Sequence, residues 1–509
     1  MTNIYENLTW LPQQPKQFAK MVSEISNLND LIQLSKFALD ENALRRLSKK
    51  FTVLRQEQDS PALTPLTLGV ASNATTSLNS PPIIATALRY GVALNIVEAE
   101  FNQLAQEAFS SESSFTNHSL NALLVAIDYR GLPVAPCPGD IVLAKESVES
   151  CVSYLSSVVV ALREKTGAHI ILQNIALPPD EIAGSYEARL PGTLSWLIAN
   201  INAQLDTLIG NEVCILDVAG LASKVGTEKW NDPKLWNIAK LSFSQIYVPI
   251  YAEYICRILG SMIGKSRRCL ILDLDNTLWG GVIGDDGLDG ILIGNGDPTG
   301  EAHLNLQKTV LELRSRGIVL AISSKNEDSI ARQPFRKHPD MLIREEHIAV
   351  FQANWTDKAS NIKAIAETLS LGLESIVFLD DNPAERMQVR FELPDVCVPE
   401  LPADPALYAR TLIAAGYFET CVFSDEDLQR ASFYQENAAR TQMLKKSSNM
   451  DAYLASLKMK ISINKFDDNG RARIAQLITK SNQFNLTTRR YSESEIKEME
   501  VDPSFFTRQ

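Results

Sequence analysis

The sequence predicts an α/β protein with two successive domains, each built on a parallel β-sheet covered by helices. Short apolar runs of strand length alternate with helical stretches from about residue 66 onward. Polar residues follow many of these runs, at the positions where open α/β sheets bind ligands. We therefore divide the chain into a helical lead-in over 1–60, a first α/β domain over 61–263, a second over 264–405 and a C-terminal part over 406–509.

The composition is that of an ordinary globular protein, with 45% hydrophobic and 22% charged residues in a chain of 509. The net charge of −12 argues against nucleic acid or an anionic membrane as the main partner, because both favour a basic face. No run has the roughly 18 apolar residues of a membrane span, and no basic-then-apolar signal opens the chain. The seven cysteines form no C-x-x-C pair, which indicates reduced thiols. We expect a cytoplasmic protein that binds neither nucleic acid nor membrane.

The lead-in is predicted to be helical, because apolar residues recur at helical spacing over 30–39. The first α/β domain follows a proline-marked boundary at 61–65. Its expected strands are 66–71, 94–98, 122–128, 169–173 and 212–217.

The strand ends of this first domain vaguely resemble an SGNH-type hydrolase, with Ser72 in the nucleophile's place and Asn174 in the oxyanion loop. A working member needs a late Asp-x-x-His, and the segment 230–236, Trp-Asn-Asp-Pro-Lys-Leu-Trp, contains no histidine. A serine without a base is a poor nucleophile. The pattern therefore favours a structural or docking role for this domain over hydrolysis.

The second domain begins with a buried strand whose end carries acids. Four residues, 269–272, lead into Asp273, and Asp275 and Thr277 follow at every second position, which in an extended segment is one face. A simple Asp-Asn turn is one interpretation. However, two carboxylates at a buried strand tip repel one another, and a divalent metal with a phosphoryl group commonly offsets that repulsion.

Three further segments complete the predicted site. The expected strand 317–324 ends in Ser324, a helix over 358–369 begins with Lys358, and the strand 375–381 ends in a pair of acids. These acids are Asp380 and Asp381. Each residue alone is weak evidence, but their order places them at one edge of a parallel sheet.

This order resembles the four-motif pattern of the haloacid dehalogenase (HAD) superfamily. The resemblance implies that Asp273 is the nucleophile that takes a phosphoryl group and that Asp275 is the acid/base. It also implies that Ser324 and Lys358 hold the phosphoryl oxygens. A carboxylate that attacks phosphorus must be ionised, and both Mg²⁺ and a lysine favour the ionised form.

The same resemblance implies a Mg²⁺ ion held by the Asp273 side chain, the Asp275 backbone carbonyl and Asp380, with Asp381 as a neighbour. Few residues separate the motifs, so the domain has no room for a large cap. An uncovered site admits a bulky or protein-borne substrate.

A closer resemblance, spanning nearly the whole chain, is to the FkbH-like family. It rests on Asp-Leu-Asp-Asn-Thr-Leu-Trp-Gly-Gly-Val-Ile-Gly-Asp-Asp-Gly at 273–287, Ser-Lys-Asn at 324–326, Asn-Trp-Thr-Asp-Lys at 354–358, Phe-Leu-Asp-Asp-Asn-Pro at 378–383 and the segment 230–236. Members of that family take 1,3-bisphosphoglycerate, remove phosphate and deliver a glyceryl unit to the phosphopantetheine thiol of an acyl carrier protein in polyketide biosynthesis. Some members have a cysteine directly before the motif serine, where this chain has Ser323.

The C-terminal part contains an expected strand over 458–466 and a helix over 471–483. These resemble the beginning of a GNAT-like acyltransferase domain, so a partial GNAT-like α+β segment is expected. The whole pattern implies a Mg²⁺-dependent HAD enzyme that loads a three-carbon acyl unit onto a carrier protein. Two alternatives are a simple HAD phosphatase of a small phosphorylated metabolite and a non-catalytic docking module of a synthase.

Overall fold

The computed structural model describes residues 3–57, 63–208, 213–421, 425–446, 462–466, 468–480 and 493–508. The chain divides into two compact units, Met1–Ala439 and Arg440–Gln509. The first unit holds the lead-in, both sheets and the beginning of the C-terminal part, and the second holds the remainder of that part.

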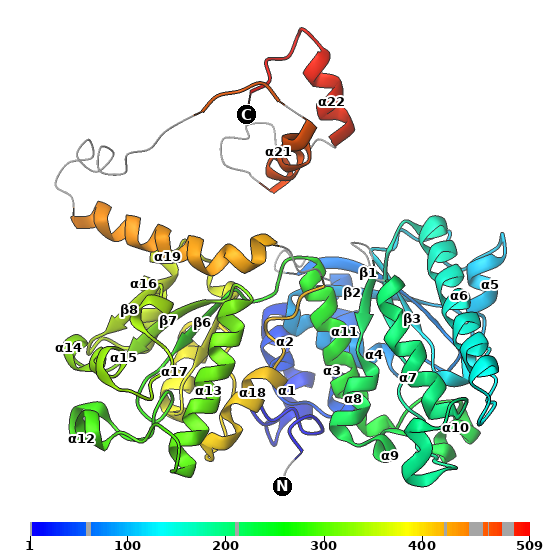
Figure 1. Cartoon of the computed structure of the whole chain (residues 1–509), viewed down its shortest axis with the longest axis horizontal. Helices are drawn as coiled ribbons and strands as arrows, with labels where there is room; N and C mark the ends of the chain where they lie inside the picture. The colour runs from blue at the N-terminus through cyan, green and yellow to red at the C-terminus, as the bar shows by residue number, and fades with distance from the viewer. Residues whose placement is uncertain are drawn as a thin grey trace. The chain divides into compact units, whose positions relative to one another are not determined.

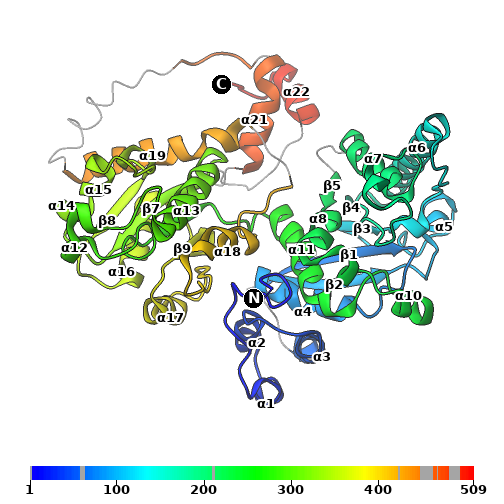
Figure 2. The same ribbon diagram turned by 60° about the horizontal axis from the view of Figure 1, so that its bottom comes forward.

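The lead-in forms three helices, α1 (Phe18–Glu24), α2 (Leu28–Ser35) and α3 (Glu41–Glu57). Figure 2 shows these three helices next to one another. Their apolar faces form one buried cluster with residues of α4 (Ser80–Ala87). This packing is expected for helices that are apolar on one side only, because each must bury that side.

The first sheet has five parallel strands in the order β2-β1-β3-β4-β5. The strands are β1 (Thr64–Ser72), β2 (Val92–Glu98), β3 (Ala122–Ala126), β4 (His169–Gln173) and β5 (Val213–Leu216). Besides α4, the connecting helices are α5 (Leu104–Phe109), α6 (Ile141–Thr166), α7 (Leu194–Gln204), α8 (Val218–Val225), α9 (Thr227–Trp230), α10 (Pro233–Ala239) and α11 (Val248–Met262). Helices cover both faces of the sheet, and two separate apolar clusters fill the spaces between helices and strands (Figure 1).

The second sheet has four parallel strands in the order β8-β7-β6-β9. They are β6 (Cys269–Leu272), β7 (Val319–Ser324), β8 (Val350–Ala353) and β9 (Ile376–Leu379). The helices of this part are α12 (Ile283–Gly290), α13 (Pro298–Ser315), α14 (Asp328–Ala331), α15 (Gln333–Lys337), α16 (Lys358–Leu369), α17 (Pro383–Glu392) and α18 (Tyr408–Ala414). The strand β8 was not predicted from the sequence.

Both faces of the second sheet are buried, which explains its continuous apolar strands. Alternate residues of β6 contribute to two clusters, Leu270 and Leu272 to one and Cys269 and Ile271 to the other. The first cluster contains residues of α13 and α18, and the second contains residues of α16 and α17. Only α12 and α13 lie between β6 and β7, so no cap domain is inserted there.

These features confirm the predicted fold class of two Rossmann-like parallel-sheet domains, the second without a cap. Among the helices that the structure describes, none is both long and apolar enough to cross a lipid bilayer.

The C-terminal part contains the long helix α19 (Asp425–Lys446), followed by α21 (Asp468–Lys480) and α22 (Glu493–Val501). The predicted helix over 471–483 corresponds to α21, as far as the described residues extend. Of the predicted strand over 458–466, residues 458–461 lie outside the described residues, and 462–466 are not in a strand. Instead, α21 pairs with α22 through an ion pair of Arg471 with Glu500 at 2.9 Å.

Candidate active site

The carboxyl ends of three neighbouring strands bring the predicted residues together. In the register of the second sheet, Leu272 pairs with Ile322 of β7 on one side and with Leu379 of β9 on the other. The next residue, Asp273, continues the pattern because its backbone N–H donates to the carbonyl of Leu379 at 2.9 Å. The acids that follow β6 and β9 and the serine that ends β7 therefore share one edge.

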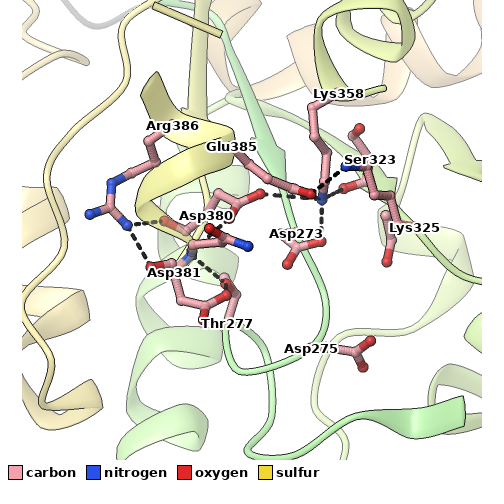
Figure 3. A network of polar contacts seen from close by, with 12 residues as sticks. Asp273, Asp275, Thr277, Ser323, Lys325, Lys358, Asp380, Asp381, Glu385 and Arg386 are labelled. Carbon is pink, nitrogen blue, oxygen red and sulfur yellow. Dashed lines mark hydrogen bonds and ion pairs between the residues drawn. The ribbon is translucent and has the colours of Figure 1, made fainter. Parts of the chain in front are cut away.

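Lys358 is the cation of this edge. It is the first residue of α16, which the side chain of Asp357 caps by accepting from the backbone N–H of Ser360. Its side chain is 1% exposed, and the ammonium forms an ion pair with Asp273 and another with Asp380 at 3.2 Å. It also donates to the carbonyl of Ser323 at 2.8 Å. Figure 3 shows the ammonium at the centre of the polar network.

The carboxylates beside Lys358 form a candidate cation site. Among the residues that the structure describes, Asp273, Asp380 and Asp381 form the one cluster in which three potential metal ligands have oxygens within 4.8 Å of one another. The Oδ2 atom of Asp380 is buried and faces the Lys358 ammonium at 3.2 Å. Carboxylate oxygens are the ligands that hard divalent cations such as Mg²⁺ prefer. The residues therefore fit such an ion.

The electrostatics of the cluster reflect this crowding. Burial raises the pKa of the Asp273 carboxyl, against the attraction of Lys358. Burial and then the neighbouring charge of Asp273 raise the pKa of Asp380. Burial disfavours the charged form of Lys358, but its carboxylate neighbours outweigh that effect and raise its pKa. Without a bound cation, one ammonium thus faces more negative charge than it can neutralise.

Further contacts fix the loop after β9, which carries Asp380 and Asp381. The hydroxyl of Thr277 donates to Oδ1 of Asp381 at 3.3 Å and accepts from its backbone N–H at 3.2 Å. The buried guanidinium of Arg386 donates to the carbonyls of Asp380 and Asp381 at 2.9 and 2.6 Å. Arg386 is itself held by an ion pair with Glu400 at 2.8 Å. The two acids are therefore positioned from both sides.

Asp275 is held apart from this cluster. Its carboxylate accepts hydrogen bonds from the indole of Trp279 and the backbone N–H of Ile283, both at 3.0 Å, and from the amide of Asn326 at 2.7 Å. In Figure 3 the carboxylate lies away from that of Asp273. The structure thus brings five of the six predicted site residues to one edge and places the side chain of Asp275 beside it.

Comparisons with known proteins identify the family. A family model described as the FkbH N-terminal domain matches residues 67–260. The crystal structure of the N-terminal part of protein BF1531 from Bacteroides fragilis, described as containing a phosphatase domain complexed with Mg, has 31% sequence identity to this chain and a TM-score of 0.68. The match covers 76% of this chain and 100% of that chain. This chain belongs to the FkbH-like family of the HAD superfamily.

Other similarities to the FkbH-like chain are weaker. A putative HAD hydrolase of subfamily III A from Legionella pneumophila has 15% identity and a TM-score of 0.19, with 37% of this chain and 96% of that chain covered. A 3-deoxy-D-manno-octulosonate 8-phosphate phosphatase from Moraxella catarrhalis has 18% identity and a TM-score of 0.17, with 38% and 95% covered. No curated protein matches the sequence.

Sequence reasoning missed several polar residues of the FkbH-like site. Glu385 contacts Lys358 at 3.3 Å and Lys325 at 2.7 Å, so its carboxylate lies between two lysines. Burial alone would raise the pKa of Glu385, but the two lysines lower it. The only signal for this residue in the sequence is its place in the first turn of the helix that begins at Pro383.

The strand ends of the first sheet of the FkbH-like chain also carry polar residues, but these are engaged in hydrogen bonds within the domain. The hydroxyl of Ser72 donates to the carbonyl of Ala126 at 2.7 Å and accepts from the backbone N–H of Ala74 at 3.0 Å. The predicted oxyanion residue, Asn174, donates to Asp217 at 2.8 Å. A hydroxyl bonded to a main-chain carbonyl has no base to take its proton, which agrees with the predicted structural or docking role.

Proposed function

We propose that this FkbH-like chain is a Mg²⁺-dependent phosphatase of the HAD type in which Asp273 takes the phosphoryl group. The observation that carries the proposal is the buried ion pair of Lys358 with Asp273 and Asp380 at the end of three parallel strands. Asp273, Asp380 and Asp381 would hold the ion, together with the backbone carbonyl of Asp275. When bound, Mg²⁺ supplies positive charge that neutralises the transferring phosphoryl group.

The protein's own residues account for both chemical steps. In the first, an oxygen of Asp273 attacks phosphorus, the bond from phosphorus to the leaving oxygen breaks, and Asp275 gives that oxygen a proton. In the second, water attacks phosphorus, Asp275 takes back a proton, and the bond to Asp273 breaks as phosphate leaves. Lys358 and Ser324 hold the phosphoryl oxygens in both steps.

Within that chemistry, we propose 1,3-bisphosphoglycerate as the substrate and an acyl carrier protein as the acceptor of the glyceryl unit. The carrier thiol would attack the acyl carbon, the carbon–oxygen bond would break, and the acyl phosphate would leave as phosphate. The other phosphate would be removed at Asp273. Family membership supports this substrate, and the uncapped site suits a protein-borne one.

A covalent cysteine relay is not part of this proposal. The residue before the motif serine is Ser323, which is buried. The nearby Cys269 lies inside β6, where burial raises the pKa of its thiol to about 12. A thiol that stays protonated is a poor nucleophile. Direct transfer from the phosphorylated substrate to the carrier thiol is therefore favoured.

A second candidate function is a simple phosphatase of a small phosphorylated metabolite. The observation that favours it is that Ser323, and not a cysteine, precedes Ser324. A non-catalytic docking module is disfavoured, because a scaffold has no need of Asp273, Asp380 and Lys358 in one buried network.

One experiment separates these functions. The protein is incubated with 1,3-bisphosphoglycerate, Mg²⁺ and a pantetheinylated carrier protein, and the carrier is weighed by mass spectrometry while released phosphate is measured. A glyceryl mass on the carrier that depends on the protein and on Mg²⁺ supports loading. Enzyme-dependent phosphate release without that mass supports the simple phosphatase. The absence of both would contradict an enzymatic function on this substrate.

A further inference from the structure

The side chain of Asn326 links two parts of the site that the proposed mechanism uses separately. It lies two residues after Ser324, in the turn that follows β7, and is 5% exposed. Its amide nitrogen donates to Oδ2 of Asp275 at 2.7 Å and to the hydroxyl oxygen of Ser324 at 3.1 Å. Both amide hydrogens are thus engaged by site residues.

The first of these bonds orients the acid/base. Oδ1 of Asp275 already accepts from the indole of Trp279 and from the backbone N–H of Ile283. Oδ2 accepts only from Asn326 among the described residues, so it is the oxygen with a lone pair left to carry a proton. The amide therefore holds the proton-bearing oxygen directly, while Trp279 and Ile283 hold the other oxygen of the same carboxylate.

The second bond orients the serine hydroxyl. A hydroxyl has one hydrogen to donate and can accept through its lone pairs. Because Asn326 donates to the Ser324 oxygen, the hydroxyl hydrogen must point elsewhere. That hydrogen is then available to a phosphoryl oxygen at the strand tip, which is the role proposed for Ser324.

We propose that Asn326 is a positioning residue for phosphoryl transfer, acting through Asp275 and Ser324 together. This inference rests on the proposed function, because both partners matter only if the site transfers phosphoryl groups. It assigns a role to a side chain outside the four-motif set. One amide helps to orient both the carboxyl of Asp275, which donates the proton, and the hydroxyl of Ser324, which binds the phosphoryl group.

The test compares Asn326→Ala with Trp279→Phe. The first removes both bonds of the amide, whereas the second keeps a smaller aromatic ring in the core and, of the hydrogen bonds to Asp275, removes the one from the indole. Two quantities are measured with Mg²⁺ present. One is kcat/KM for phenyl phosphate and for dinitrophenyl phosphate, whose leaving group needs little protonation. The other is the affinity for inorganic phosphate, measured by calorimetry without turnover.

For Asn326→Ala we expect kcat/KM to fall about 10²-fold for phenyl phosphate and much less for dinitrophenyl phosphate, because general acid catalysis matters only for the poor leaving group. Phosphate affinity should fall about fivefold through the misdirected serine hydroxyl. Trp279→Phe should share the dependence on leaving group but keep the phosphate affinity. If Asn326→Ala does not fold, Asn326→Leu, of similar volume and without donors, is expected to give the same results.

The inference would be overturned if Asn326→Ala lost equal factors of kcat/KM for both substrates and kept its phosphate affinity, because the loss of a merely structural residue would have that effect. It would also be overturned by a loss of phosphate affinity in Trp279→Phe that matches the loss in Asn326→Ala. Failure of the proposed function looks different: the unaltered protein would then hydrolyse neither substrate and bind no phosphate.

Discussion

Replacing Lys358 by methionine should destabilise the metal-free protein strongly. The ammonium is 1% exposed and is the shared partner of Asp273, Asp380 at 3.2 Å and Glu385 at 3.3 Å. Methionine has a similar length and no charge, so in the variant these carboxylates stay buried but lose the ammonium that neutralises them. Removing one partner of a buried ion pair costs about 3–5 kcal/mol, because the other charge stays desolvated.

The loss of stability in Lys358→Met should grow as the pH rises. The folded-state pKa values of Asp273 and Asp380 are already raised, and removal of Lys358 raises them further. A carboxyl whose pKa is higher in the folded than in the unfolded state contributes stability below the unfolded pKa, and this contribution is lost as pH rises through the folded pKa. The variant should therefore be closest to the unaltered protein near pH 5 and furthest from it near pH 8.

Urea unfolding of the metal-free protein at both pH values measures this effect, and Lys325→Met is the matched control. The side chain of Lys325 is 40% exposed and pairs with Glu385 at 2.7 Å, and such a pair is worth about 0–1 kcal/mol. Activity of Lys358→Met should fall by roughly 10²-fold or more, since charge stabilisation of the transferring group is lost. A loss of stability below about 1 kcal/mol for Lys358→Met, equal to that of the control, would refute the reasoning.

Three other predictions follow from the same site. Mg²⁺ should raise the melting temperature measured by calorimetry, and the rise should be larger at pH 8 than at pH 5. The reason is that Asp273 and Asp380, whose pKa values are raised, carry more uncompensated negative charge at the higher pH. An equal rise at both pH values would argue against binding at these acids. Asp275→Asn should lower kcat/KM for phenyl phosphate by about 10²- to 10⁴-fold without a change in the circular dichroism spectrum. Replacing each cysteine singly should leave carrier loading intact by mass spectrometry, whereas one variant that loses loading and keeps phosphate release would reveal a relay.

Much of the second domain could be predicted from the sequence because its strands are short, apolar and followed by polar residues. The helix predicted over 358–369 coincides with α16, whose first residue is Lys358. The acids after β6 and β9 meet because neighbouring parallel strands end at one edge. The edge strand β8 was missed because Gln352 interrupts its four residues, whereas β6 and β9 are unbroken apolar runs.

The rest of the site depends on contacts that no sequence period reveals. Glu385 and Asn326 are polar residues in a helical first turn and in a loop, where such residues are ordinary. Their roles come from partners 27 and 51 positions away, Lys358 and Asp275. The strand predicted over 458–466 fails in its described part for a related reason, because alternating residues form a strand only if another strand pairs with them.

The measurement that tests the central claim most directly is phosphate release by Asp273→Asn. The amide has nearly the same shape as the carboxylate but cannot attack phosphorus, so the fold should be kept while the chemistry is lost. Phosphate release is measured with Mg²⁺ and 1,3-bisphosphoglycerate or phenyl phosphate, next to the circular dichroism spectrum of each protein. We predict that the unaltered protein releases phosphate and that Asp273→Asn releases none. Undiminished turnover by a folded Asp273→Asn variant would contradict the assignment of Asp273 as the residue that takes the phosphoryl group.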